Sequence, residues 1–193
     1  MIIVLCGFMG SGKSYFVKKL QQNSNEGKFL DLDDVVYFNH QAGEKNLAEL
    51  IERRGWSYFR EEEFQSLKSL LQKRENWNET LVLSLGGGTL SGRSLDLFAS
   101  TEDTILIWLE SSFEKCFERI LDEGPEKRPL LKKGKEYIHK LYLDRNLLYS
   151  KSALTISEEQ RGPIETLSDF LGFINKGVKN EKGRSGKISK DAR

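Results

Sequence analysis

The stretch GFMGSGKS at residues 7–14 decides how this chain folds. It matches the pattern G-x-x-x-x-G-K-[ST], in which the backbone N–H groups of a glycine-rich loop point toward a bound phosphate. The apolar run Ile2–Cys6 precedes it, and a helical pattern over residues 13–22 follows it. Strand, loop and helix in this order predict a phosphate-binding loop, because the helix N-terminus adds a partial positive charge that favours an anion. A glycine-rich turn that only joins strand to helix is the alternative.

Length and composition predict a single domain of 193 residues, long enough to bury a core. The formal net charge of +1 argues against a surface that coats nucleic acid. Cys6 and Cys116 have no paired spacing, so neither a disulfide framework nor a zinc site is indicated. The first strand begins at once, which leaves no room for a signal peptide, and no apolar run approaches the roughly 20 residues that span a bilayer. We therefore expect a cytoplasmic monomer with neither nucleic-acid nor membrane partners.

The last segment differs in composition from the rest of the chain. Residues 176–193 hold seven Lys or Arg and two Asp or Glu, a charge of +5, and almost no large apolar side chains. Such a segment cannot bury enough surface to offset its ordering entropy. We predict a domain over residues 1–175, whose last helix ends near Asn175, and a disordered, solvated tail. Contact of this tail with RNA or acidic lipid is the alternative.

Short apolar runs alternate with helical patterns along the domain. The runs are Ile2–Cys6, Phe29-Leu30, Leu81–Leu85, Ile105–Leu109 and Ala153–Ile156. The helical patterns cover residues 13–22, 47–54, 58–74, 92–99, 112–122, 135–150 and 163–175. The runs do not alternate polar with apolar residues, as is typical of parallel strands covered on both faces. We predict a doubly wound α/β fold, in which ligands bind at the carboxyl ends of the strands.

Chemically interesting residues follow these strands. Asp31 and Asp33 come where the second strand ends, and positions i and i+2 of an extended chain face the same side, so both carboxylates are expected in one site. A helix cap is the alternative role for this pair. Three glycines, residues 86–88, follow the third strand and let a small ligand approach the backbone; a tight turn is the alternative. Residues 122–135 form a charged, glycine-flanked stretch that indicates a mobile loop.

Six segments together resemble the shikimate kinase family, in the order in which that family has them. They are GFMGSGKS (7–14), FLDLDD (29–34), FREEE (59–63), LSLGGG (83–88), RPLL (128–131) and RNLLY (145–149). The resemblance spans nearly all of residues 1–157. It implies a P-loop, nucleoside-monophosphate-kinase-like fold of three α/β/α layers, with a five-stranded parallel sheet and a mobile lid at about residues 122–135. It also implies ATP-dependent phosphorylation of the 3-hydroxyl of shikimate, a step of chorismate and aromatic amino acid biosynthesis.

The resemblance assigns roles around the acceptor. Asp33 would bind the substrate hydroxyls and act as base or orienter of the attacking oxygen. Arg60 and Arg145 would hold the carboxylate of shikimate, which suits a bidentate guanidinium. Glu63 lies one turn beyond Arg60 and could orient it through an i,i+3 pair. Gly87 and Gly88 complete the predicted shikimate site.

The resemblance also assigns the nucleotide side, with ATP as co-substrate and Mg²⁺ as cofactor. Ser14 would bind Mg²⁺ directly and Asp31 through a water molecule, while Lys13 would reach the β- and γ-phosphates. Arg128 would move in on the lid and neutralise the transferring phosphoryl group, so the predicted catalytic residues are Lys13, Asp33 and Arg128. The predicted ATP-binding residues are Gly10, Ser11, Gly12, Lys13, Ser14, Tyr15, Arg119 and Arg128. Among them, Arg119 would stack on adenine.

Some features depart from an ordinary P-loop enzyme. The third strand carries Ser84 where a Walker B strand has an aspartate, which is why Asp31 is the candidate metal carboxylate. Glu110 follows the fourth strand, but we expect a cap or a surface charge. Segment 157–163 matches the family loosely and yields no predicted adenine contact. His40 and His139 have no catalytic partner in view and are interpreted as surface residues.

Several alternatives stay open at this point. Arg60, Arg119, Arg128 and Arg145 could each be an ordinary surface or loop charge. Another kinase of the same fold group, acting on gluconate or a nucleotide, is a second hypothesis. A nucleotide acceptor would need base-reading groups and more arginines, which argues against it. A catalytically silent ATP-binding module is a third hypothesis, and the presence of Lys13, Asp33 and Arg128 argues against it.

Overall fold

The computed structural model describes residues 1–39, 44–73 and 79–188, with side chains as far as position 179. One sheet is formed, with its strands in the order β2-β3-β1-β4-β5 and every pair of neighbours parallel. The strands are β1 (Ile2–Cys6), β2 (Lys28–Asp31), β3 (Leu81–Ser84), β4 (Thr104–Leu109) and β5 (Leu154–Ile156). The predicted five-stranded parallel sheet is confirmed, and each strand lies on its predicted apolar run.

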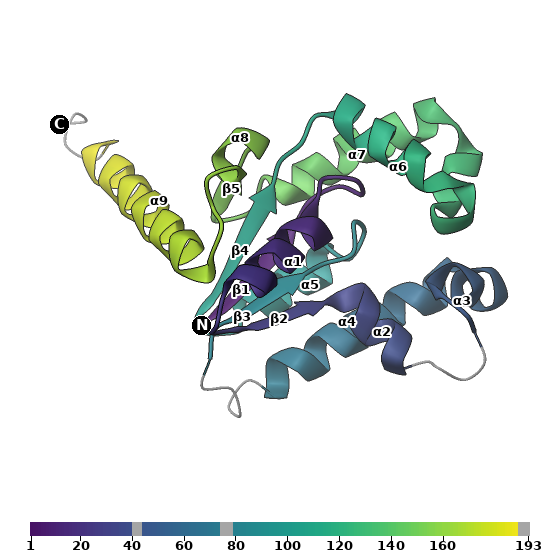
Figure 1. Cartoon of the computed structure of the whole chain (residues 1–193), viewed down its shortest axis with the longest axis horizontal. Helices are drawn as coiled ribbons and strands as arrows, with labels where there is room; N and C mark the ends of the chain where they lie inside the picture. Colours follow the sequence, from purple (N-terminus) through teal and green to yellow (C-terminus); the bar gives the residue numbers. More distant parts are fainter. Residues whose placement is uncertain (40–43, 74–78, 189–193) are drawn as a thin grey trace.

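Helices cover both faces of this sheet (Figure 1). They are α1 (Lys13–Asn23), α2 (Leu32–Asn39), α3 (Leu47–Arg54), α4 (Trp56–Gln72), α5 (Gly92–Ala99), α6 (Phe113–Lys127), the 3₁₀ helix η2 (Pro129–Lys133), α7 (Lys135–Tyr149), α8 (Glu158–Arg161) and α9 (Leu167–Ile188). Apolar side chains of α1 and α9 pack on one face, and those of α2 to α7 pack on the other. The predicted three-layer α/β/α architecture is therefore confirmed.

Strand β1 shows why its sequence is apolar at every position. Ile3 and Leu5 belong to the core beneath α1 and α9, whereas Ile2 and Val4 belong to the core on the opposite face. All four are at most 1% exposed. Successive strand residues point to opposite faces, so a central strand with two covered faces has no position left for a polar side chain.

The chain after β2 departs from the prediction. We expected Asp31 and Asp33 to lie in extended backbone, but Asp31 ends β2 and Asp33 lies in the first turn of α2, so that expectation was wrong. The Asp31 carboxylate accepts the N–H of Asp33 at 3.0 Å, a bond of the kind that caps a helix N-terminus. Asp31 is therefore both a cap and a candidate site residue.

Helix α9 is the second departure. It continues to Ile188, so the predicted helix end near Asn175 was wrong. Val178 packs against the core, and the backbone of Gly177 lies so close to Leu154 that an added Cβ would come within 2.8 Å of it. Extending an established helix is far easier than starting one, so a polar composition did not end it. The rest of the predicted tail, residues 189–193, lies outside the described residues.

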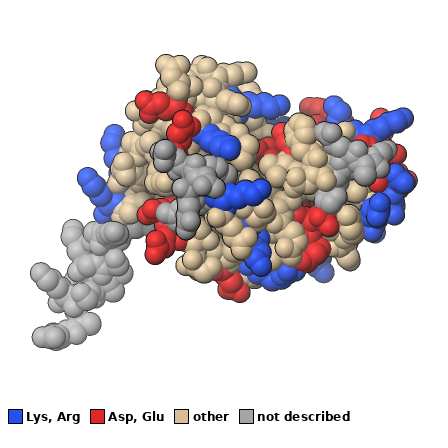
Figure 2. All heavy atoms as spheres, turned by 90° about the horizontal axis from the view of Figure 1, so that it is seen from below, with Lys and Arg blue, Asp and Glu red and all other residues tan. Residues whose placement is uncertain are grey.

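The surface carries both signs of charge. On the face shown in Figure 2, basic and acidic side chains are interspersed, as expected from a formal net charge of +1. None of the described helices combines the length and apolarity that a membrane span requires.

Candidate active site

Three neighbouring cavities lie beyond the carboxyl ends of the central strands. The arginine cavity, of about 140 Å³, contains Arg60, Arg128 and Arg145. The loop cavity, of about 280 Å³, lies over the glycine-rich loop, and the outer cavity, of about 600 Å³, lies between this loop and α8. Asp33 and Arg128 line both the arginine cavity and the loop cavity, so these two cavities share a wall.

Every predicted site residue lines at least one of these cavities. The arginine cavity has Asp33, Arg60, Gly87, Gly88, Arg128 and Arg145. The loop cavity has Gly10, Gly12, Lys13, Ser14, Tyr15, Asp31, Asp33, Gly87, Arg119 and Arg128. Ser11 lines the outer cavity, beside Gly12, Tyr15 and Arg119. Residues from distant parts of the chain thus meet in one region. This arrangement argues against the alternative that the four arginines are unrelated surface charges.

Arg60 is held in the arginine cavity by a buried carboxylate. It projects from α4 and forms an ion pair with Glu63, the predicted i,i+3 partner, whose side chain is only 1% exposed. Thr89 donates its hydroxyl to the other Glu63 oxygen at 2.6 Å. The Arg60 guanidinium also lies 5.1 Å from the ring centre of Trp56. These contacts fix Arg60 before any ligand arrives.

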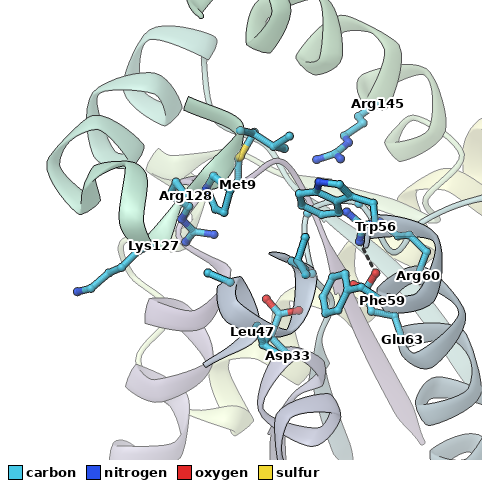
Figure 3. Close-up of a pocket in the computed structure, with 17 residues that line it drawn as sticks. Met9, Asp33, Leu47, Trp56, Phe59, Arg60, Glu63, Lys127, Arg128 and Arg145 are labelled. Carbon is cyan, nitrogen blue, oxygen red and sulfur yellow. Dashed lines mark hydrogen bonds and ion pairs between the residues drawn. The ribbon is translucent and has the colours of Figure 1, made fainter. Parts of the chain in front are cut away.

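Arg145 enters the same cavity from α7 (Figure 3). Burial lowers the pKa of its guanidinium, and the nearby Arg60 acts in the same direction. Within the described part of the chain, it has no hydrogen bond or ion pair, although it lies over the Phe8 ring at 5.6 Å. Of the two guanidinium groups, only that of Arg60 is therefore paired with the Glu63 carboxylate. The resulting excess of positive charge suits an anionic ligand.

The three glycines let the backbone pass directly beneath these arginines. A Cβ at Gly88 would lie 2.7 Å from Nη2 of Arg145 and would also collide with the Arg60 guanidinium. The buried hydroxyl of Tyr149 donates to the carbonyl of Gly87 at 2.6 Å and fixes the loop. We did not single out Tyr149 from the sequence, although it lies within the segment RNLLY that carried the resemblance.

Asp33 projects from α2 toward the arginine cavity (Figure 3). Its Oδ1 atom is buried and has no hydrogen-bond partner in the described structure. Burial raises the pKa of this carboxyl to about 7, helped by the negative charges of Asp31 and Glu63. A carboxylate with an open acceptor position and a pKa near neutrality is suited to accept a proton from a ligand hydroxyl.

Lys13 lies beneath the loop cavity and is buried. Its ammonium group donates to the carbonyls of Gly7 at 2.8 Å and Phe8 at 3.0 Å, and burial lowers its pKa to about 8. The hydroxyl of Ser14 donates to the Asp31 carboxylate at 2.7 Å, which brings two oxygen ligands together at the cavity wall. No group of three or more His, Cys, Asp or Glu side chains within the described ranges could hold a metal ion alone.

Arg128 reaches the shared wall from the segment after α6. Its Nε and Nη2 atoms donate to the two carboxylate oxygens of Glu123 at 2.7 and 3.2 Å. The predicted lid, residues 122–135, comprises the end of α6, the helix η2 and the glycines at 124 and 134. Both glycines have a positive φ, 80° and 86°, and neither would crowd an added Cβ. Motion of this segment stays a prediction.

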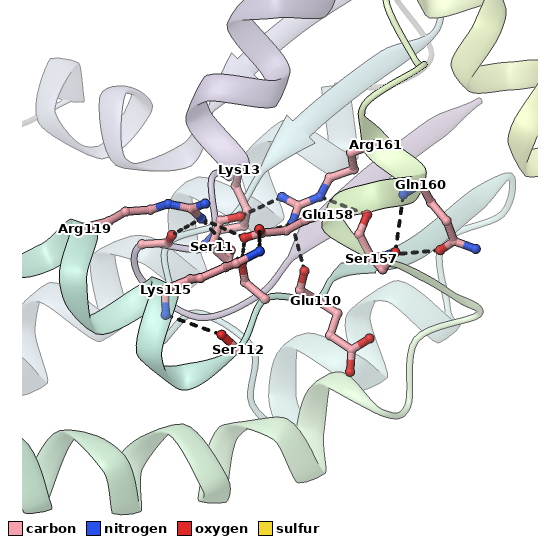
Figure 4. A network of polar contacts seen from close by, with 12 residues as sticks. Ser11, Lys13, Glu110, Ser112, Lys115, Arg119, Ser157, Glu158, Gln160 and Arg161 are labelled. Carbon is pink, nitrogen blue, oxygen red and sulfur yellow. Dashed lines mark hydrogen bonds and ion pairs between the residues drawn. The ribbon is translucent and has the colours of Figure 1, made fainter.

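A network of ionic contacts surrounds the outer cavity (Figure 4). Arg119 donates to the carbonyl of Gly10 at 3.0 Å and to Glu158 at 2.9 Å. Arg161 donates to the carbonyls of Ser11 at 2.6 Å and Glu110 at 2.8 Å. Sequence analysis missed Arg161, because segment 157–163 matched the family pattern only loosely. The available signal was a basic residue shortly after the last strand of a parallel sheet.

The residues predicted to be bystanders behave as expected where the structure describes them. The Glu110 side chain is exposed, and only its carbonyl joins the network. Ser84 is buried at the end of β3. His139 is exposed and lies 4.5 Å from the Phe113 ring centre. His40 lies outside the described residues.

Comparison with known proteins gives a consistent result. The family model described as "Shikimate kinase" matches residues 9–175. A shikimate kinase of Persephonella marina is 34% identical over 89% of this chain and 98% of its own length. A shikimate kinase of Flavobacterium psychrophilum is 33% identical over 87% of this chain and 95% of its own length. The crystal structure of shikimate kinase from Aquifex aeolicus has a TM-score of 0.70 at 26% identity and covers 94% of this chain and 98% of its own. A structure of a shikimate kinase from Acinetobacter baumannii in complex with shikimate has a TM-score of 0.64 at 25% identity and covers 80% of this chain and 82% of its own.

Proposed function

Because this chain belongs to the shikimate kinase family, we propose that it transfers the γ-phosphoryl group of ATP to the 3-hydroxyl of shikimate. The products are shikimate 3-phosphate and ADP, and the reaction is a step of chorismate and aromatic amino acid biosynthesis. The observation that carries this proposal is the wall that the arginine cavity shares with the loop cavity. An anionic acceptor in one cavity would present its hydroxyl to a phosphate held in the other.

Arg60 and Arg145 are proposed to bind the carboxylate of shikimate. The excess of positive charge over Glu63 supports this role, because a ligand carboxylate would complete the set of charge-assisted hydrogen bonds. Gly87 and Gly88 would lie against the ring of the substrate. A side chain at Gly88 would displace the arginines, and one at Gly87 would meet the backbone of Met9. The cavity volume of about 140 Å³ suits a compact acceptor.

Asp33 is proposed to bind the reacting hydroxyl and to accept its proton. The surroundings of Asp33 act in opposite directions: burial, Asp31 and Glu63 disfavour its charged form, whereas Lys13 and Arg128 favour it. As the oxygen attacks, the proton passes to the carboxylate and the O–P bond forms while the bond to the leaving ADP oxygen breaks. Phosphoryl transfer depends on such positioning and on charge neutralisation more than on covalent help from the protein.

The loop cavity and the outer cavity are proposed to hold ATP. Lys13 would exchange the carbonyls of Gly7 and Phe8 for phosphate oxygens, and Arg128 would neutralise the transferring group. Backbone N–H groups of the loop and the N-terminus of α1 would bind the remaining phosphate oxygens. The larger outer cavity, beside Arg119, would take the nucleoside. The lid would exclude water, which otherwise competes as acceptor.

The oxygen ligands at the loop cavity suit Mg²⁺, which prefers oxygen ligands and keeps several of its waters. The Ser14 hydroxyl would bind the ion directly, and Asp31 would bind one of its waters; their 2.7 Å contact supports this pairing. When bound, the ion would neutralise charge on the β- and γ-phosphates.

A coupled assay of ADP release tests the function. We expect Mg²⁺-dependent ADP release from ATP that requires shikimate, and little release with water alone. Gluconate and nucleoside monophosphates serve as competing acceptors. Faster turnover with either of these would contradict the assignment, and absence of turnover with any acceptor would indicate an ATP-binding module.

We also propose that the enzyme acts as a cytoplasmic monomer. All side chains assigned to the three cavities come from one chain, and both cysteines are free and buried. Size-exclusion chromatography with light scattering tests whether the protein is a monomer. Activity that appears only in a larger species would contradict it.

A further inference from the structure

The ion pair between Glu123 and Arg128 bridges a break in helix α6. Glu123 precedes Gly124, whose φ of 80° and ψ of 165° interrupt the helix, and Arg128 follows the short segment beyond that break. The two N–H···O bonds, of 2.7 and 3.2 Å, form a bidentate contact along one side of the guanidinium. Glu123 therefore connects the body of α6 to the start of the predicted lid.

This contact leaves part of the guanidinium available. Arginine has five N–H donors, and the contact with Glu123 uses only those on Nε and one side of Nη2. The guanidinium points into the space opposite Asp33 (Figure 3), at the wall shared by the loop and arginine cavities. Its Nη1 atom has no partner among the described residues, and Arg128 lines the boundary at which the phosphoryl group would pass between the two substrates.

We propose that Glu123 is a positioning residue that holds Arg128 in this orientation before ATP binds. The inference rests on the proposed function and adds to it a residue that does not touch the reacting atoms. An arginine side chain beyond a glycine break would otherwise sample many rotamers, and ordering it would cost rotamer entropy. Holding it in advance removes that ordering from the catalytic step.

A purely structural role for this ion pair is not sufficient. The side chains are 34% and 37% exposed, and ion pairs of such exposure contribute little to stability. The opposite functional role is that Glu123 competes with phosphate for Arg128 and so restrains the enzyme. Glu123 itself also lines the loop cavity. Two observations favour positioning: the contact is side-on, and it leaves Nη1 of Arg128 without a partner in the described chain while Arg128 lines both cavities.

The test compares Glu123→Gln with the control Asp122→Asn. Asp122 precedes Glu123 on the same exposed helix end, carries the same charge and has no ion pair within the described chain. We expect Glu123→Gln to lower kcat about tenfold with Tm and the KM for shikimate unchanged, and the control to behave as wild type. Arg128→Ala should lose more than Glu123→Gln, since arginines that stabilise a phosphoryl transition state contribute about 10³–10⁵-fold.

A double-mutant cycle then decides whether Glu123 acts through Arg128. Adding Glu123→Gln to Arg128→Ala should cause no further loss of kcat. An equal loss in both backgrounds would overturn the proposal, as would a single variant with unchanged or raised kcat and a lower KM for ATP, which indicates competition. Wild-type protein without shikimate-dependent ADP release would overturn the proposed function itself, so the two failures are distinguishable.

Discussion

The arginine cavity and the loop cavity are prepared for their ligands in different ways. In the arginine cavity, Arg60 is already fixed by Glu63, while Arg145 has no anionic partner within the described chain. In the loop cavity, Lys13 donates to loop carbonyls and Arg128 to Glu123. The arginine cavity thus has one guanidinium without an anionic partner in the described chain, whereas the cations of the loop cavity already have hydrogen-bond acceptors within the protein.

The difference between the two cavities follows from the ligands that they are proposed to bind. A buried carboxylate ligand brings one or two strong contacts, so its site must be rigid beforehand to limit the ordering cost. A triphosphate brings many strong acceptors and can displace internal ones such as the Gly7 and Phe8 carbonyls. We therefore expect the arginine cavity to change little on binding and the loop cavity to exchange partners.

The largest effect is expected from removing the cation of the loop cavity. Lys13→Met should lower kcat by about 10³–10⁵-fold, the range for a cation that neutralises a transferring phosphoryl group, because its charge meets the phosphate oxygens directly. The fold should survive, because Lys13 is buried and its lowered pKa shows that the free protein disfavours its positive charge. Circular dichroism and steady-state kinetics check both points. Turnover like that of wild type in a folded variant would remove Lys13 from the mechanism.

The next largest effect is expected from Asp33, which lines both cavities. Asp33→Asn should lower kcat by about 10²–10⁴-fold, the contribution typical of a positioned acid or base, and weaken shikimate binding with little change for ATP. Asp34→Asn, its exposed neighbour, is the matched control. If ATP binding collapsed while shikimate binding survived, Asp33 would be a metal ligand and the proposed roles of Asp31 and Asp33 would be reversed.

The pH dependence of the wild type sharpens the same point. Asp33 must be ionised to act as base, so kcat/KM should rise with pH toward about 7 and fall above about 8 as Lys13 loses its proton. The pKa of Asp33 in the folded protein lies above the ordinary value of an aspartate, so ionisation of Asp33 opposes folding as pH rises. Asp33→Asn should therefore raise Tm most at pH 8 and progressively less toward pH 4. A Tm gain that grows as pH falls would contradict this assignment.

A smaller effect is expected from neutralising the ligand of the arginine cavity. Shikimate methyl ester removes the charge that Arg60 and Arg145 are proposed to bind, which should cost about 1.5–3 kcal/mol, or roughly 10–150-fold in kcat/KM. The KM for ATP should not change, because the loop cavity is untouched. An ester turned over as well as the acid would place the carboxylate elsewhere.

The sequence predicted the cavities because their residues are local signals at fixed places in a parallel fold. A glycine loop after β1, carboxylates after β2 and glycines after β3 must meet at one edge of the sheet. The partners that hold the cations could not be predicted in this way. Glu123 and Glu158 are ordinary helix glutamates. Glu123 reaches Arg128 across the break at Gly124, and the packing of α8 near α6 brings Glu158 to Arg119.

The same limit explains the two errors. The pattern around Asp31 was read as extended chain, yet a capped helix with its own apolar face begins immediately after that residue. The polar composition after Asn175 suggested that the last helix ends there, but composition does not show that Val178 reaches the core. Both errors concern where a helix begins or ends, which depends on hydrogen bonds and tertiary contacts that a linear pattern does not contain.

The smallest kinetic effect is expected from the end of the chain, which lies outside both cavities. Every residue assigned to a site precedes position 162, so deleting residues 181–193 or 176–193 should leave kcat and both KM values unchanged. The two truncations should differ in stability instead. The longer one removes Val178 and the cover over Leu154, a loss of about 1 kcal/mol that lowers Tm by about 2–4 °C in a protein of this size. Thermal melting and steady-state kinetics of both truncations test this, and a tenfold loss of kcat/KM in either would mean that α9 supports the nucleotide side of the site.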